Sequence, residues 1–164
     1  MSLPVTLQIN VAPSDIKHLP VILPHQLEVW GSQCSEILII HDSQKANTLF
    51  SKGDWNTQAQ QLETFLQSLS SSLRVLSVDY TETTKNKMNH YFFQNQPIPD
   101  KDFRGGPFYA YFYGLFMAQN DWILHLDSDM MFGGQSQHWL EEALHFLETD
   151  EHLLCCCPLS GPPT

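Results

Sequence analysis

The segment Ile123–Phe132, with the sequence ILHLDSDMMF, decides the fold prediction. Its short apolar run ends abruptly at two carboxylates, Asp127 and Asp129, which are separated by one residue. A continuous apolar run is typical of a strand buried in a parallel sheet. Open α/β sheets bind their ligands beyond the carboxyl ends of the strands. The segment therefore predicts a buried parallel strand with two carboxylates at the edge where an α/β protein has its binding site.

Strands and helices are expected to alternate on either side of this segment. Apolar or alternating runs predict five strands, at 5–11, 35–43, 73–79, 122–126 and 153–157. Helices are expected within 19–30, from a capping box at Thr57 and Gln60, over 108–118, and after a cap at Ser136. The segment 80–104 is expected to be a long loop with at most one helical turn. This order predicts a single α/β domain over residues 1–164, with a mainly parallel, Rossmann-like sheet and helices on both faces.

The composition indicates an acidic globular protein. Hydrophobic residues make up 42% of the chain, and 18 acidic against 8 basic residues give a formal net charge of −10. This excess of acids argues against a nucleic-acid partner and against anionic membrane surfaces, because both require a basic face. We find no apolar run of transmembrane length, no basic leader and no cysteine spacing typical of zinc ligands. We therefore expect a cytoplasmic protein without a transmembrane segment, whose reduced cysteines are small buried side chains.

The paired carboxylates favour a hard cation. Mg²⁺ and Mn²⁺ prefer oxygen ligands, and Mg²⁺ is usually held by one or two carboxylates together with substrate phosphates. Asp127 and Asp129 supply that number, and a bridging cation would allow so acidic a protein to bind an anionic phosphate. The ordinary alternative is a solvated turn, because Asp and Ser are common turn residues.

The order of the elements and the motif together resemble the N-terminal half of a GT-A glycosyltransferase, and most closely the family-2-like enzymes that use nucleotide-diphosphate sugars. The resemblance covers most of the chain. It rests on a second strand ending at Asp42, a third ending at Asp79, the segment Arg104–Gly106 before a helix, and the sequence LDSD at 126–129. It implies a sheet of the nucleotide-diphospho-sugar transferase type.

The resemblance also implies roles for individual residues. Asp127 and Asp129 would hold Mn²⁺ or Mg²⁺ at the donor diphosphate, where the ion stabilises the leaving nucleoside diphosphate as a Lewis acid. The nucleotide-binding residues that it implies are Asp42, Asp79, Arg104, Gly105 and Asp127. Ordinary explanations remain open, since Asp42 fits a turn, Asp79 a solvated strand end and Arg104 a surface charge.

The expected function is transfer of a sugar, by an enzyme of the hexosyltransferase type, from a nucleotide-diphosphate sugar, with a UDP-sugar preferred, to an unidentified acceptor. Such transfer in inverting enzymes needs a carboxylate base at the acceptor hydroxyl, yet the acids after Asp129 all lie on or near the last expected helix. The chain therefore resembles a truncated or unusually short member of the family. The alternative is a non-catalytic module that binds a nucleotide sugar or a partner, and a homodimer that covers an exposed sheet edge is compatible with either function.

Overall fold

The structure is a computed structural model, and it describes residues 2–45, 53–69, 71–133 and 138–157. The chain divides into two compact units, Ser2–Phe132 and Gly133–Thr164. The first unit contains the whole sheet, and the second contains the helix α5 (Trp139–Thr149). Within the described part of the chain, no helix combines the length and the apolar character needed to cross a membrane.

Four parallel strands form the sheet of the larger unit, in the order β3-β2-β1-β4. They are β1 (Leu3–Val11), β2 (Cys34–His41), β3 (Arg74–Ser77) and β4 (Trp122–Asp127). The chain leaves β3 at one edge of the sheet and returns as β4 on the other side of β1, which creates a topological switch point between β1 and β4. The prediction of an α/β fold with a parallel, Rossmann-like sheet is confirmed for the described residues.

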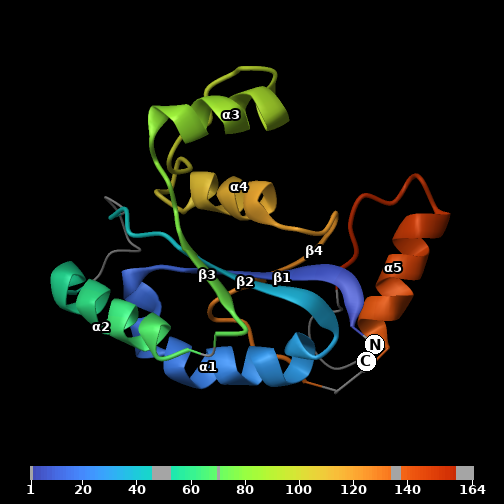
Figure 1. The fold of residues 1–164 in the computed structure, drawn as a ribbon, viewed down its shortest axis with the longest axis horizontal. Helices are drawn as coiled ribbons and strands as arrows, with labels where there is room; N and C mark the ends of the chain where they lie inside the picture. Colours follow the sequence, from blue (N-terminus) through green and yellow to red (C-terminus); the bar gives the residue numbers. More distant parts are fainter. Residues whose placement is uncertain (1, 46–52, 70, 134–137, 158–164) are drawn as a thin grey trace. The chain divides into compact units, whose positions relative to one another are not determined.

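Helices cover both faces of this sheet. Figure 1 shows α1 (Leu19–Gln26) and α2 (Trp55–Gln67) on one side, and α3 (Glu82–Phe93) and α4 (Phe108–Met117) on the other. A 3-10 turn at Pro13–Lys17 follows β1, and α1 continues into a π-helical turn at Leu27–Gly31. The central strand β1 is therefore buried on both faces, and its carboxyl end opens towards the connections that lead into α1 and out of β4.

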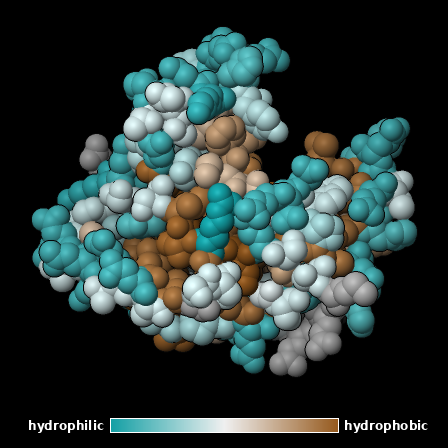
Figure 2. Space-filling model, viewed as in Figure 1, coloured by the Kyte–Doolittle hydropathy of each residue, from teal (hydrophilic) through white to brown (hydrophobic). Residues whose placement is uncertain are grey.

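The face below α3 and α4 is packed with large apolar side chains. Leu38 and Ile40 of β2 form one buried cluster with Met88 of α3 and with Tyr109 and Tyr113 of α4. Each fully buried side chain of this size contributes about 1.5–3 kcal/mol relative to its exposed state. Figure 2 shows mainly hydrophilic side chains over the outer surface of α3 and hydrophobic ones across the middle of the view, over the sheet.

Two helix predictions are wrong. The segment 80–104, expected as a loop, contains the twelve-residue helix α3, which begins after Thr81 and has Met88 as its only fully buried residue. One buried position gives too weak an apolar period to indicate a helix. α2 begins after Asp54, whose carboxylate accepts hydrogen bonds from the backbone N–H groups of Asn56 and Thr57, so the cap lies three residues before the predicted Thr57.

The predictions for the C-terminal segment also need correction. The apolar run at 153–157 pairs with no strand in the described part of the chain, and Leu154 is 94% exposed. Cys34 is buried as expected, whereas Cys155 and Cys157 are exposed. The predicted helix over the last part of the chain is present as α5, but its predicted cap, Ser136, lies outside the described residues.

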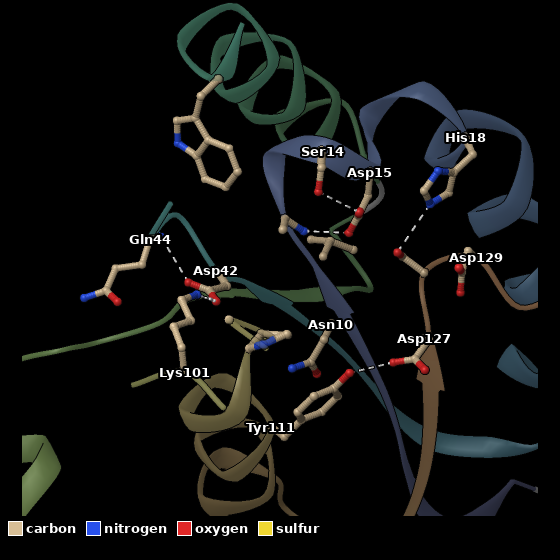
Figure 3. A pocket seen from close by; sticks show the side chains of 16 residues that line it. Asn10, Ser14, Asp15, His18, Asp42, Gln44, Lys101, Tyr111, Asp127 and Asp129 are labelled. Carbon is tan, nitrogen blue, oxygen red and sulfur yellow. Dashed lines mark hydrogen bonds and ion pairs between the residues drawn. The ribbon is translucent and has the colours of Figure 1, made fainter. Parts of the chain in front are cut away.

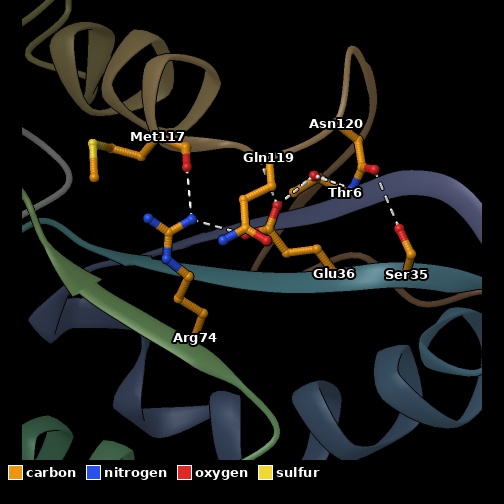
Figure 4. A network of polar contacts seen from close by, with 7 residues as sticks. All are labelled: Thr6, Ser35, Glu36, Arg74, Met117, Gln119 and Asn120. Carbon is orange, nitrogen blue, oxygen red and sulfur yellow. Dashed lines mark hydrogen bonds and ion pairs between the residues drawn. The ribbon is translucent and has the colours of Figure 1, made fainter.

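A polar network ties the turn between α4 and β4 to the amino ends of the other strands (Figure 4). Glu36 of β2 accepts hydrogen bonds from the Thr6 hydroxyl at 2.6 Å, from Arg74 Nη1 at 2.8 Å and from the Gln119 backbone N–H at 2.8 Å. Arg74 also donates to the Met117 carbonyl at 2.7 Å. Burial raises the pKa of Glu36, but these hydrogen bonds and the Arg74 charge outweigh it and lower the pKa overall. The network fixes the start of β4 beside β1.

Candidate functional site

A pocket with a volume of about 260 Å³ lies at the carboxyl ends of β1, β2 and β4. Figure 3 shows Asn10 of β1 at its floor, Asp42 after β2 on one side, and Asp127 and Asp129 at the end of β4 on the other. This is the switch point of the sheet, where open α/β proteins bind their ligands. The first sequence prediction, that the Asp-x-Asp pair stands at a ligand-binding edge, is consistent with this placement.

The turn that carries the two aspartates is held from α1. Gln26, which is fully buried, donates from Nε2 to the carbonyl of Asp127 at 2.8 Å and to that of Met130 at 2.9 Å. Ser128, between the aspartates, is buried, and its hydroxyl lies 3.4 Å from His18 Nε2. Because the backbone and the central residue are held, the carboxylates on either side of Ser128 project from a well-defined turn.

The two carboxylates of this turn have different surroundings. Asp127 Oδ1 accepts a hydrogen bond from the Tyr111 hydroxyl at 2.8 Å and lies 3.6 Å from His125 Nε2. The neighbouring His125 imidazole and the Tyr111 hydroxyl together lower the pKa of Asp127 despite its partial burial. Asp129 is exposed, and its carboxylate has no hydrogen-bond or ion-pair partner among the described residues. Asp127 is therefore an oriented, charged acid, and Asp129 is open to a ligand.

Asp42 lines the pocket with a carboxylate that already has three donors. It accepts from Lys101 Nζ at 2.5 Å, from the Tyr80 hydroxyl at 2.8 Å and from the Gln44 backbone N–H at 3.0 Å. The side chain of Asp42 is 3% exposed. A nearby ion pair joins Lys85 to Asp100 at 2.8 Å. In this state, Asp42 anchors the segment that contains Lys101 to the end of β2.

Of the remaining predicted residues, only Gly105 lines the pocket. Its φ of +84° is a conformation that favours glycine. Asp79 accepts from the Thr81 backbone N–H at 2.8 Å and from the Thr84 hydroxyl at 2.6 Å, and these hydrogen bonds lower its pKa. Arg104 packs its guanidinium over the Phe103 ring, 5.0 Å from the centroid. Asp79 thus supports Thr81, the N-cap residue of α3, and neither Asp79 nor Arg104 is part of the pocket lining.

Asn10, Lys101 and Tyr111 are among the polar residues of the pocket lining that were not predicted from the sequence. Lys101 belongs to the segment expected as a loop, and Tyr111 to a helix whose aromatic side chains were expected to be core. A signal for Tyr111 was available, because a buried tyrosine hydroxyl usually needs a hydrogen-bond partner. Asn10 occupies a polar position near the carboxyl end of an alternating strand, which indicates the binding edge once the strand is known to be parallel.

The charges of the pocket favour a cation. Among the described residues, four carboxylates line it, those of Asp15, Asp42, Asp127 and Asp129, against one lysine, Lys101, which is paired with Asp42. Within the described part of the chain, no three His, Cys, Asp or Glu side chains are grouped closely enough to form a metal site by themselves. Two carboxylates with a phosphate ligand would suit Mg²⁺ or Mn²⁺, which often take their remaining ligands from substrate and water.

Comparisons of the chain with protein families, with curated proteins and with solved structures found no match. The α/β fold and the pocket at the strand ends are therefore the basis for the functional proposal.

Proposed function

We propose that this chain binds a nucleotide-diphosphate sugar in the pocket at the end of β4 and acts as a GT-A-type glycosyltransferase. The observation that carries the proposal is the open carboxylate of Asp129 beside the oriented carboxylate of Asp127, at the switch point of a parallel sheet. An acidic pocket binds an anionic diphosphate only with a bridging cation, and these two acids are suited to hold Mn²⁺ or Mg²⁺. When bound, such an ion would supply Lewis-acid stabilisation of the leaving diphosphate.

The protein side chains would contribute orientation and charge. Tyr111 and His125 keep Asp127 ionised and in one position, and Gln26 holds the turn that separates the two acids. Lys101, paired with Asp42, is the cation of the lining that could approach an anionic ligand. A preorganised site of this kind binds without the energetic cost of ordering its own groups.

A second candidate is a module that binds the nucleotide sugar but does not transfer it. It is favoured by the state of the other acids in the lining: Asp42 is occupied by three donors, and Asp15 accepts from the Ala12 backbone N–H at 2.8 Å and from the Ser14 hydroxyl. Neither is placed as a free general base. Hydrolysis or transfer of a UDP-sugar would separate the two functions, whereas binding alone would not.

The binding proposal is tested by calorimetric titration of UDP into the protein with Mn²⁺, with Mg²⁺ and with a chelator. We expect binding that depends on the cation and that is lost in Asp129→Asn. Asp121→Asn is the matched control, because Asp121 is exposed and lies before β4, outside the pocket lining. If neither UDP nor GDP binds under any of these conditions, the donor-site proposal is wrong, and the Asp-x-Asp sequence is a solvated turn.

A further inference from the structure

Asn10 carries a buried hydrogen-bond donor that has no partner among the described residues. The residue is 7% exposed, lies at the carboxyl end of β1 and lines the pocket. Its Nδ2 atom is buried, and none of the residues that the structure describes supplies an acceptor for it. A buried polar group without a partner is unfavourable by about 1–3 kcal/mol. Groups of this kind are uncommon in native proteins and call for a specific explanation.

The orientation of the Asn10 amide follows from its neighbours. Gln8, two residues earlier on β1, donates from Nε2 to the backbone carbonyl of Tyr111 at 3.2 Å and to Asn10 Oδ1 at 2.9 Å. The Tyr111 carbonyl accepts hydrogen bonds only, so the Gln8 amide must present its nitrogen there. The Asn10 atom that meets this nitrogen must then be the oxygen. The chain of contacts therefore leaves Asn10 Nδ2 as the free end, and rotating the amide would place two NH₂ groups against each other.

The surroundings of this donor indicate what it can bind. Asn10 is the register partner of Asp127 on β4, and Asp42 follows β2 on its other side. Figure 3 shows the Asn10 amide between the Asp42–Lys101 pair and the Tyr111–Asp127 pair, with its nitrogen turned away from Tyr111. An anionic oxygen here would be repelled by both carboxylates unless a cation accompanied it. An uncharged oxygen would satisfy the donor without that repulsion.

We propose that Asn10 is a specificity-determining residue of the pocket, and that its Nδ2 donates a hydrogen bond to an uncharged carbonyl or hydroxyl oxygen of the bound nucleoside. This inference rests on the proposed function for the identity of the ligand. Because Nδ2 is buried, binding includes a small local displacement of the side chains that cover it. Asp127 and Asp129 would bind the diphosphate through its cation, and Asn10 would bind the uncharged nucleoside part of the same ligand.

The test uses uridine and UDP as probes of these two parts, with binding followed by NMR titration for uridine and by calorimetry for UDP with Mn²⁺. Asn10→Asp replaces the donor by an acceptor of nearly the same shape. We expect the affinity for both probes to fall about 10- to 100-fold, because a site built around a hydrogen bond discriminates strongly when that bond is lost. Asn10→Ala removes the donor without adding charge, so it should also weaken both probes. The matched control is Asn86→Asp on the exposed surface of α3.

Each outcome decides the proposal. The proposal is supported if the Asn10 variants are folded but lose binding of both uridine and UDP, while the Asn86→Asp control binds both probes as the wild type does. If the Asn10 variants bind both probes as the wild type does, the role of Asn10 is wrong while the donor site stands. Loss of UDP with unchanged uridine binding, or a wild type that binds UDP but not uridine, refutes the assignment to the nucleoside. A wild type that binds neither probe overturns the donor site, and this inference with it.

Discussion

The close approach of α4 to β1 at Gly114 leads to a sharp prediction about stability. A Cβ atom at this position would lie 2.3 Å from Gln8 Nε2 and 2.4 Å from Gln8 Cδ. Gln8 is fully buried on β1 and forms the two hydrogen bonds that hold the Tyr111 carbonyl and the Asn10 amide. The substitution Gly114→Ala therefore cannot be accommodated unless the Gln8 amide moves and both of these hydrogen bonds are disturbed.

The expected magnitude follows from three contributions. Overpacking a buried site is unfavourable by about 1–3 kcal/mol, and the two disturbed hydrogen bonds add roughly 0.5–1.5 kcal/mol each. Alanine is better than glycine inside a helix, which offsets about 0.5–1 kcal/mol. We therefore expect Gly114→Ala to lower the free energy of unfolding by about 1–5 kcal/mol.

A double-mutant cycle in urea unfolding measures the coupling between Gly114→Ala and Gln8→Ala, and so tests this explanation directly. In the Gln8→Ala background the added methyl group no longer meets the glutamine amide, so Gly114→Ala should be neutral or stabilising by about 0.5–1 kcal/mol. If Gly114→Ala causes the same loss in both backgrounds, the contact with Gln8 is not the cause, and the argument for a close approach at this point is refuted. Equal m-values across the four proteins would show that the compared states are equivalent.

Two further predictions concern acid groups. The lowered pKa of Glu36 means that its stabilising contribution is complete above the ordinary value of 4.5 and is lost as the pH falls through its folded value. Glu36→Gln should therefore destabilise the protein by roughly 1–3 kcal/mol near neutral pH, as measured by urea unfolding. The difference in stability should shrink in acid, and a difference independent of pH would contradict the proposed network. Tyr111→Phe removes one of the contacts that lower the pKa of Asp127, so carboxyl NMR titration should find that pKa raised towards its ordinary range. An unchanged titration would show that the His125 imidazole alone accounts for the lowered pKa of Asp127.

The strands were predictable because local sequence patterns mark them, but the burial of the polar side chains on β1 was not. β1 alternates apolar and polar residues, a pattern typical of a strand with one face in solvent. In the structure Thr6, Gln8 and Asn10 are all buried, 0%, 0% and 7% exposed. Thr6 and Gln8 have hydrogen-bond partners in distant parts of the chain, Glu36 and Tyr111, and no local period could indicate them.

The site was predictable to the extent that it depends on strand ends. Asp42, Asp127 and Asp129 line one pocket because parallel strands end at the same edge of the sheet. Asp79 also follows a strand, but its carboxylate is bound to the first turn of α3, at the Thr81 backbone N–H and the Thr84 hydroxyl. That helix was not predicted, so the competing use of Asp79 was not visible from the sequence. The role of Asp42 as an anchor for Lys101 is likewise a contact between residues 59 positions apart.

The position of β4 beside β1 has a consequence for how the protein folds. The contact between Thr6 and Asn120 joins residues 114 positions apart, and closing so long a loop must precede the gain from pairing these strands. We therefore expect β4 to join the sheet late, after β1 and β2 have paired. Until it does, a chain emerging from the ribosome carries an open edge on its central strand, and such edges are sites of misassembly between nascent chains.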